Sequence, residues 1–115
     1  MSQVFQIDYL EFPSADGIGT RRFLEEAFGW QFTDYGAEYT GIEAAGIGAG
    51  IDSSSGRTAA TLPVIRCSDL VAAEKAVLAA GGAITRPAFD FPGGRRFHFR
   101  EPGGVELAVY ISTEE

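Results

Sequence analysis

The sequence predicts an α+β protein built from two modules that each read strand, helix, strand, strand, strand. Three observations predict this class: an internal repeat, two amphipathic helical patterns that end at glycine, and short apolar runs separated by glycine-rich turns. The chain has 115 residues, of which 45% are hydrophobic and 22% are charged, so it is about one domain long. We therefore expect one domain over 1–115 with two related halves.

The internal repeat joins ADGIGTRRFLEEAFGWQFT, which starts at Ala15, to SDLVAAEKAVLAAGGAIT, which starts at Ser68. Asp16 matches Asp69 and Gly29 matches Gly82, at a constant offset of 53 positions. This offset places module one at about 1–53 and module two at about 60–112, joined by the small, polar segment 53–60. Because either module alone would bury too little, we expect the two to form one compact unit or to complete each other across a dimer.

Module one begins with a strand over VFQIDYLEF and continues with a helix that Asp16 caps and Gly29 ends. Four apolar side chains share one face of this helix, those of Phe23, Leu24, Ala27 and Phe28. Such a face predicts a surface helix that lies on a sheet. The runs WQFTDY, YTGIEA and IGAGID are the remaining strands.

Module two repeats this order, with a strand over TLPVIRC and a helix that Asp69 caps. The apolar face of this helix consists of Leu70, Ala73, Val77 and Ala80. The strands AITRPAF, RRFHFR and VELAVYI follow. The segment FDFPGGRR (Phe89 to Arg96) is the least repeated part, and it is either a mobile lid or a hairpin turn.

Charge and cysteine content exclude several classes of protein. A net charge of −7 repels phosphate backbones and anionic membranes, so we expect neither nucleic acid nor membrane as a partner. The single Cys67 lies in an apolar run, where a small buried hydrophobe is expected, and this fits a reducing compartment. The N-terminus has no signal-peptide pattern and no segment has eighteen consecutive apolar residues, so we expect a cytoplasmic protein.

Four segments resemble the vicinal oxygen chelate superfamily, which includes glyoxalase I, bleomycin-resistance proteins and extradiol dioxygenases. They are IDYLEFPSAD, RRFLEEAFGWQF, DLVAAEKAVLAAGG and FHFREPGGVEL. The last contains EPGGV at Glu101 to Val105, where the family has a DPxGN turn. The resemblance implies curled mixed sheets around a cleft, helices on the outside and a frequent homodimer.

The family's metal positions are the first test of what this chain does. Family enzymes typically hold a divalent metal with one ligand from the first and one from the last strand of each module, and these positions fall on Tyr9, Gly50, Leu62 and Ala108. Divalent metals need His, Cys, Asp or Glu donors, and this set offers at most one phenolate. A displaced site made of Glu11, His98 and Glu106 has no supporting spacing. We therefore expect no metal and no other cofactor.

Two carboxylates are the remaining candidates for catalysis. Glu11 and Glu106 each lie two residues from a metal position, so strand alternation places them on the same side of the sheet. Either can serve as the acid or base of a metal-free enzyme. The alternative is that both pair with arginines such as Arg66, Arg96 or Arg100 and only shape a wall.

The cleft implied by the resemblance is expected to bind a small organic molecule. The ligand-pocket candidates are Tyr9, Glu11, Phe32, Gly50, Leu62, Val64, His98, Glu106 and Ala108. Trp30 is expected in the core, whereas Phe32 is open to either a core or a ligand-stacking role. This predicts a binding or sequestration protein of the bleomycin-resistance type, and the alternative is a lactoylglutathione-lyase-like lyase, isomerase or dioxygenase with a non-standard site.

Overall fold

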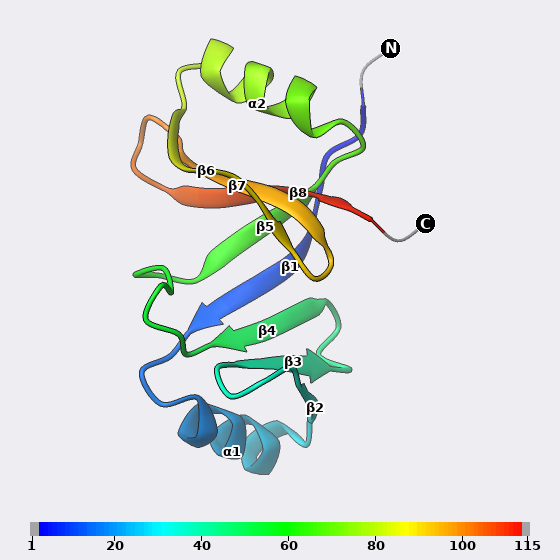
Figure 1. Cartoon of the computed structure of the whole chain (residues 1–115). Helices are drawn as coiled ribbons and strands as arrows, with labels where there is room; N and C mark the ends of the chain where they lie inside the picture. The colour runs from blue at the N-terminus through cyan, green and yellow to red at the C-terminus, as the bar shows by residue number, and fades with distance from the viewer. Residues whose placement is uncertain (1–2, 114–115) are drawn as a thin grey trace. The chain divides into compact units, whose positions relative to one another are not determined.

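The computed structural model describes residues 3–113, and its elements follow the predicted order. They are β1 (Gln6–Pro13), α1 (Gly17–Phe28), β2 (Gln31–Asp34), β3 (Tyr39–Glu43), β4 (Gly48–Asp52), β5 (Leu62–Arg66), α2 (Leu70–Ala79), β6 (Ala83–Phe91), β7 (Gly94–Arg100) and β8 (Glu106–Ser112) (Figure 1). The α+β class and the two βαβββ modules are thereby confirmed. No helix in residues 3–113 is long and apolar enough to cross a membrane.

The chain divides into two compact units by its contacts. The first unit is Tyr9–Leu62, and the second consists of the described residues of Met1–Asp8 and Pro63–Glu115. The residues before Tyr9 therefore lie with the second unit, although we expected them in module one. The Gln3 side chain accepts hydrogen bonds from the backbone of Ser68 and Asp69 at 2.8 and 3.0 Å. These bonds tie the start of the chain to the beginning of α2.

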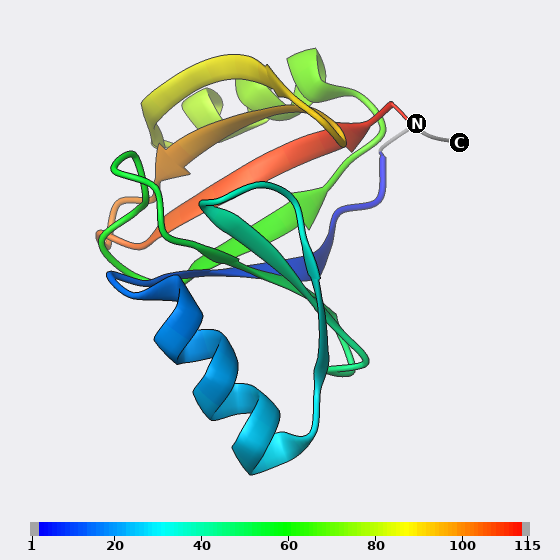
Figure 2. The same ribbon diagram turned by 60° about the horizontal axis from the view of Figure 1, so that its bottom comes forward.

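The first unit has a mixed sheet in the order β1, β4, β3, β2. β1 and β4 are parallel, and the other neighbours are antiparallel. α1 contacts β3 and β4 from one face (Figure 2). The buried core of the first unit consists of Ile42, Ala49 and Ile51, against which Leu24 and Trp30 pack.

The apolar face predicted for α1 is only partly covered. Leu24 packs against the core as expected, but the Phe23 and Phe28 side chains are 65% and 59% exposed. The ends of the helix are stabilised by its caps, because Asp16 accepts a hydrogen bond from the Gly19 amide and Gly29 adopts the left-handed conformation at the end.

The second unit repeats the topology in the order β5, β8, β7, β6, with β5 and β8 parallel. Its core includes Cys67, which is buried as predicted, together with Leu70, Ala73, Phe97, Phe99 and Val109. Asp69 caps α2 by accepting a hydrogen bond from the Ala72 amide at 3.0 Å. The segment Phe89 to Arg96 forms the paired hairpin that joins β6 to β7, which is the hairpin alternative of the prediction.

Candidate functional site

Each sheet has one face under its helix and one face without it, and the predicted site residues fall almost entirely on the helix-free faces. Tyr9, Glu11 and Gly50 lie on that face of the first unit by strand register. Phe32 is the exception, because it pairs with Ile42 on the opposite face and packs against the core. The Arg21 guanidinium lies 5.4 Å from the centroid of the Phe32 ring. Phe32 is therefore not on the same face as the other ligand-pocket candidates of this unit.

A hydrogen-bonded cluster of two tyrosines and one glutamate occupies the helix-free face of the first unit. The hydroxyl oxygens of Tyr9 and Tyr39 are 2.5 Å apart, and the Tyr39 hydroxyl donates to Glu11 Oε2 at 3.0 Å. Glu11 is 4% exposed. A buried carboxylate needs donors to offset its desolvation, and the Tyr39 hydroxyl is one of them.

The Tyr39 hydroxyl is held in its neutral, donating form. Burial raises its pKa, and the neighbouring Glu11 carboxylate raises the pKa further because a phenolate beside it would be repelled. Tyr39 therefore serves as a fixed hydrogen-bond donor at ordinary pH. The sequence did not reveal this role, because Tyr39 is 30 positions from Tyr9 and lies on another strand.

The four family metal positions do not fit a divalent metal. Gly50, Leu62 and Ala108 have no donor side chain, and the two tyrosine hydroxyls fill the space beside Gly50. Within residues 3–113, no group of three or more His, Cys, Asp or Glu side chains is arranged to hold a metal ion. These side chains therefore lack the His, Cys, Asp and Glu donors that divalent metals prefer in proteins.

Glu106, the second predicted carboxylate, connects three strands of the second unit. Its Oε2 accepts a hydrogen bond from Thr85 at 2.9 Å, and its Oε1 lies 3.7 Å from Arg100 Nη2. His98 Nδ1 lies 3.6 Å from Oε2, and His98 is 2% exposed. Arg100, one of the arginines named as possible partners, thus lies beside Glu106.

Cationic and aromatic side chains alternate in one row across the helix-free face of the second unit. The strand register aligns Arg66 with Tyr110, Tyr110 with Arg96 and Arg96 with Phe89. The Arg66 guanidinium lies 5.8 Å from the Tyr110 ring, and Arg96 lies 5.5 Å from the Phe89 ring. We call these four residues the arginine–aromatic row.

A second line of residues runs beside this row, with two apolar members on β5 and β8 and two basic members on β7 and β6. It aligns Val64 with Ala108, Ala108 with His98, and His98 with Arg86. Arg86 reaches back to Phe89, with its guanidinium 3.8 Å from the ring centroid. Val64 and Ala108 are buried, so they provide a small apolar floor between charged neighbours.

The alternation of residues along two predicted strands could have predicted part of this face. Arg96, His98 and Arg100 occupy alternate positions of one predicted strand, as do Glu106, Ala108 and Tyr110 of the next. The row itself depends on the register between strands. That register also depends on the irregular pairing of β6, which shifts between Ile84 and Arg86 and again before Phe89.

No model of a protein family and no curated protein matches the chain, whereas solved structures do. A Mn(II)-bound glyoxalase from Novosphingobium aromaticivorans matches with a TM-score of 0.72 and 19% identity, over 96% of this chain and 40% of that one. Methylmalonyl-CoA epimerase from Mycobacterium tuberculosis matches with a TM-score of 0.70 and 13% identity, over 92% and 87%. A glyoxalase/bleomycin resistance protein/dioxygenase superfamily member from Vibrio splendidus 12B01 gives 0.63 and 9%, over 96% and 100%. At these identities the likeness establishes a shared fold alone.

Proposed function

We propose that this chain, whose fold is that of the vicinal oxygen chelate superfamily, binds a small planar organic anion on the helix-free face of its second unit. The observation that carries the proposal is the arginine–aromatic row, in which Arg66, Tyr110, Arg96 and Phe89 alternate across four strands. Guanidinium groups recognise carboxylates, and aromatic rings stack on planar groups. The row offers both kinds of contact to one ligand.

The charge distribution of the chain supports an anion as the ligand. The net charge is −7, yet five of its nine basic residues lie on β5, β6 and β7. No carboxylate oxygen of the described residues lies within ion-pair distance of the Arg66 or Arg86 guanidinium. A bound carboxylate could therefore form an ion pair with these two arginines without breaking an existing one.

The Phe89 ring orients the Arg86 guanidinium for binding a carboxylate. Arg86 stacks 3.8 Å from the Phe89 ring, and Phe89 is itself half-buried beside His98 at 5.7 Å. A guanidinium stacked on a ring keeps the N–H groups of its edge available to donate to a carboxylate, and it loses little side-chain entropy on binding. The ring faces favour a planar ligand over an aliphatic one of the same charge.

Acid–base catalysis on the same face is the second candidate function. The pairing of Glu106 with the buried His98 at 3.6 Å favours it, because a carboxylate beside an imidazole can accept and return a proton. Removal and return of a proton on a carbon next to a carbonyl group is chemistry that an epimerase can perform, and one protein of the same fold is a methylmalonyl-CoA epimerase. Enzyme-dependent exchange of deuterium into a bound organic acid, lost in Glu106→Gln, would support this candidate.

A matched series of three small molecules tests the binding proposal. Benzoate carries charge and ring, benzamide keeps the ring without the charge, and cyclohexanecarboxylate keeps the charge without the planar ring. In NMR titrations we expect benzoate to bind at least about fivefold more tightly than either of the others. The chemical-shift changes should lie on β5, β6, β7 and β8.

Two arginine variants locate the site. Arg86→Gln should weaken benzoate binding by about fivefold or more, because it removes the cation that stacks on Phe89 of the row. Arg95→Gln is the matched control, since Arg95 lies on the other face of β7 and pairs with Asp90 at 2.8 Å. Equal affinities of benzoate and benzamide, or equal losses in both variants, would contradict the proposal.

A further inference from the structure

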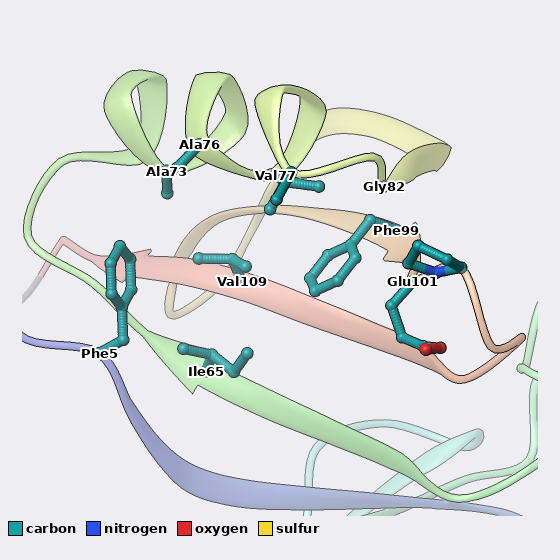
Figure 3. A pocket seen from close by; sticks show the side chains of 11 residues that line it. Phe5, Ile65, Ala73, Ala76, Val77, Gly82, Phe99, Glu101 and Val109 are labelled. Atoms are coloured by element: carbon teal, nitrogen blue, oxygen red, sulfur yellow. The ribbon is translucent and has the colours of Figure 1, made fainter.

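A cavity lies on the face of the second unit's sheet opposite the arginine–aromatic row, between α2 and strands β5, β7 and β8 (Figure 3). It has a volume of about 270 Å³. The residues around it are almost all apolar, and they include Ile65, Val77, Phe99 and Val109. Because this cavity faces the helix, it is separate from the arginine–aromatic row and does not depend on the function proposed for that row.

The sequence of α2 explains why this space is open. The helix presents alanines toward the sheet, and Ala73, Ala76 and Ala80 line the cavity together with Gly82. Figure 3 shows Ala73, Ala76 and Val77 directed toward β8. Side chains this small do not fill the space between the helix and the sheet, whereas Leu or Ile at the same positions would fill it.

Solvent can reach the cavity from its edges. Ala76 on α2 is exposed, and Phe5, at one end of the cavity, is 47% exposed. An apolar cavity of about 150 Å³ is already large enough to bind benzene. The volume here therefore accommodates a single aromatic ring with a short substituent.

One charged group lies at the end of the cavity opposite Phe5, the carboxylate of Glu101 (Figure 3). The turn after β7 fixes this carboxylate, since its Oε1 accepts a hydrogen bond from the Gly103 amide at 2.6 Å and its Oε2 accepts one from Val105 at 3.2 Å. A fixed carboxylate at the edge of an apolar cavity repels anions and attracts a cation or a hydrogen-bond donor.

We propose that the cavity beneath α2 is a binding site for a small aromatic amine, with the ring between α2 and β8 and the ammonium group at Glu101. The apolar residues select the ring, and the carboxylate selects the charge. The preferred charge is opposite to that of the ligand proposed for the arginine–aromatic row. Binding of one ligand can thus be followed without interference from the other.

Benzylamine and benzyl alcohol form the matched pair of probes. In NMR titrations to about 10 mM, the methyl signals of Val77 and Val109 should shift with both probes, and benzylamine should bind about fivefold more tightly. Glu101→Gln should abolish this preference and leave benzyl alcohol binding within about twofold of wild type, because Gln keeps an amide oxygen for the turn.

A cavity-filling variant distinguishes a binding site from nonspecific adsorption. Ala76→Leu should weaken both probes by about tenfold or more, whereas Ala72→Leu, an equal change outside the cavity lining, should leave both within about twofold. If Ala76→Leu fails to fold, Ala76→Val provides the smaller change at the same place. Unshifted Val77 and Val109 methyls, or unchanged binding in the filled variant, would overturn the proposal. Equal binding of the two probes would overturn the assignment to amines.

Discussion

The hydroxyl oxygens of Tyr9 and Tyr39 lie 2.5 Å apart, in the space that a side chain at position 50 would occupy. Gly50 has an ordinary backbone conformation, so its glycine identity is required by this close approach and not by a positive φ angle. Three consequences follow for one small region. A family metal position has no donor, the tyrosines have room to meet, and Glu11 gains the Tyr39 hydroxyl as a donor.

Gly50→Ala should destabilise the first unit by about 1–3 kcal/mol, because the added methyl group overlaps both tyrosine hydroxyls. Chemical denaturation followed by circular dichroism measures the change. Gly56→Ala is the control, since its nearest neighbour beyond the adjacent residues is Ser54 Oγ at 4.0 Å, and it should cost less than about 0.5 kcal/mol. Similar denaturation midpoints for the two variants would show that the space beside Gly50 is not filled.

Tyr39 should make stability fall at alkaline pH. Its folded pKa lies above the ordinary value of 10.0, so the folded protein holds this proton more tightly than the unfolded chain. The resulting stabilisation is fully present below pH 10.0 and is lost as the pH rises above that value.

Tyr39→Phe should therefore lose about 1 kcal/mol of the free energy of unfolding at neutral pH, since the hydrogen bond to Glu11 is gone. Above the ordinary tyrosine pKa, its stability should fall less steeply than that of wild type. Some slope remains, because burial also raises the pKa of Tyr110. Tyr35→Phe, at a 65% exposed ring, is the control. An alkaline slope equal to wild type in Tyr39→Phe would contradict the assignment.

The fold was predictable because its signals are local and occur twice. The aspartates that cap α1 and α2 occupy matching positions in the two modules, and a left-handed glycine follows each helix, Gly29 after α1 and Gly81 after α2. Strand alternation then placed Tyr9 with Glu11 and Ala108 with Glu106 on shared faces. Each of these inferences needs only one segment of chain.

The parts that could not be predicted depend on contacts between segments. The contact of Tyr9 with Tyr39 depends on the pairing of β1, β4 and β3. The position of Phe32 on the sheet face that packs under α1 depends on the register of β2 with β3. The exposure of Phe23 and Phe28 is similar, because periodicity marks an apolar face and the sheet beneath decides how much of it is covered.

We expect purified protein to contain no stoichiometric transition metal. Tyr9, Gly50, Leu62 and Ala108 provide too few donors, and the tyrosine hydroxyls already fill one of the four places. Elemental analysis after expression with added zinc and manganese measures this. About one equivalent of either metal, retained through dialysis, would contradict the expectation.

We expect the chain to form a homodimer in solution. The exposed Phe28 ring on α1 contacts Phe23 at 6.4 Å and Trp30 at 5.4 Å, which gives an apolar surface cluster. A stable dimer buries more than about 1,000 Å², and such a cluster suits its centre. Sedimentation should show a dimer for wild type and a monomer for Phe23→Ser with Phe28→Ser.

Val71→Ser is the control for the dimer test, because Val71 is 66% exposed on α2 and outside this cluster. It should leave the sedimentation coefficient unchanged. A wild-type monomer at micromolar concentration would contradict dimerisation itself. A dimer that persists in the double variant would place the interface elsewhere.

Glu106→Gln should change ligand affinity more than stability. Gln keeps an acceptor for Thr85, and the lost ion pair joins groups that are 48% and 22% exposed, so unfolding should change by less than about 1 kcal/mol. Benzoate should bind about threefold more tightly, because Arg100 is no longer neutralised. Glu43→Gln, which removes an exposed carboxylate bonded to Thr33, is the control and should alter neither quantity. A steep loss of melting temperature with unchanged benzoate affinity would instead identify Glu106 as a structural ion-pair partner.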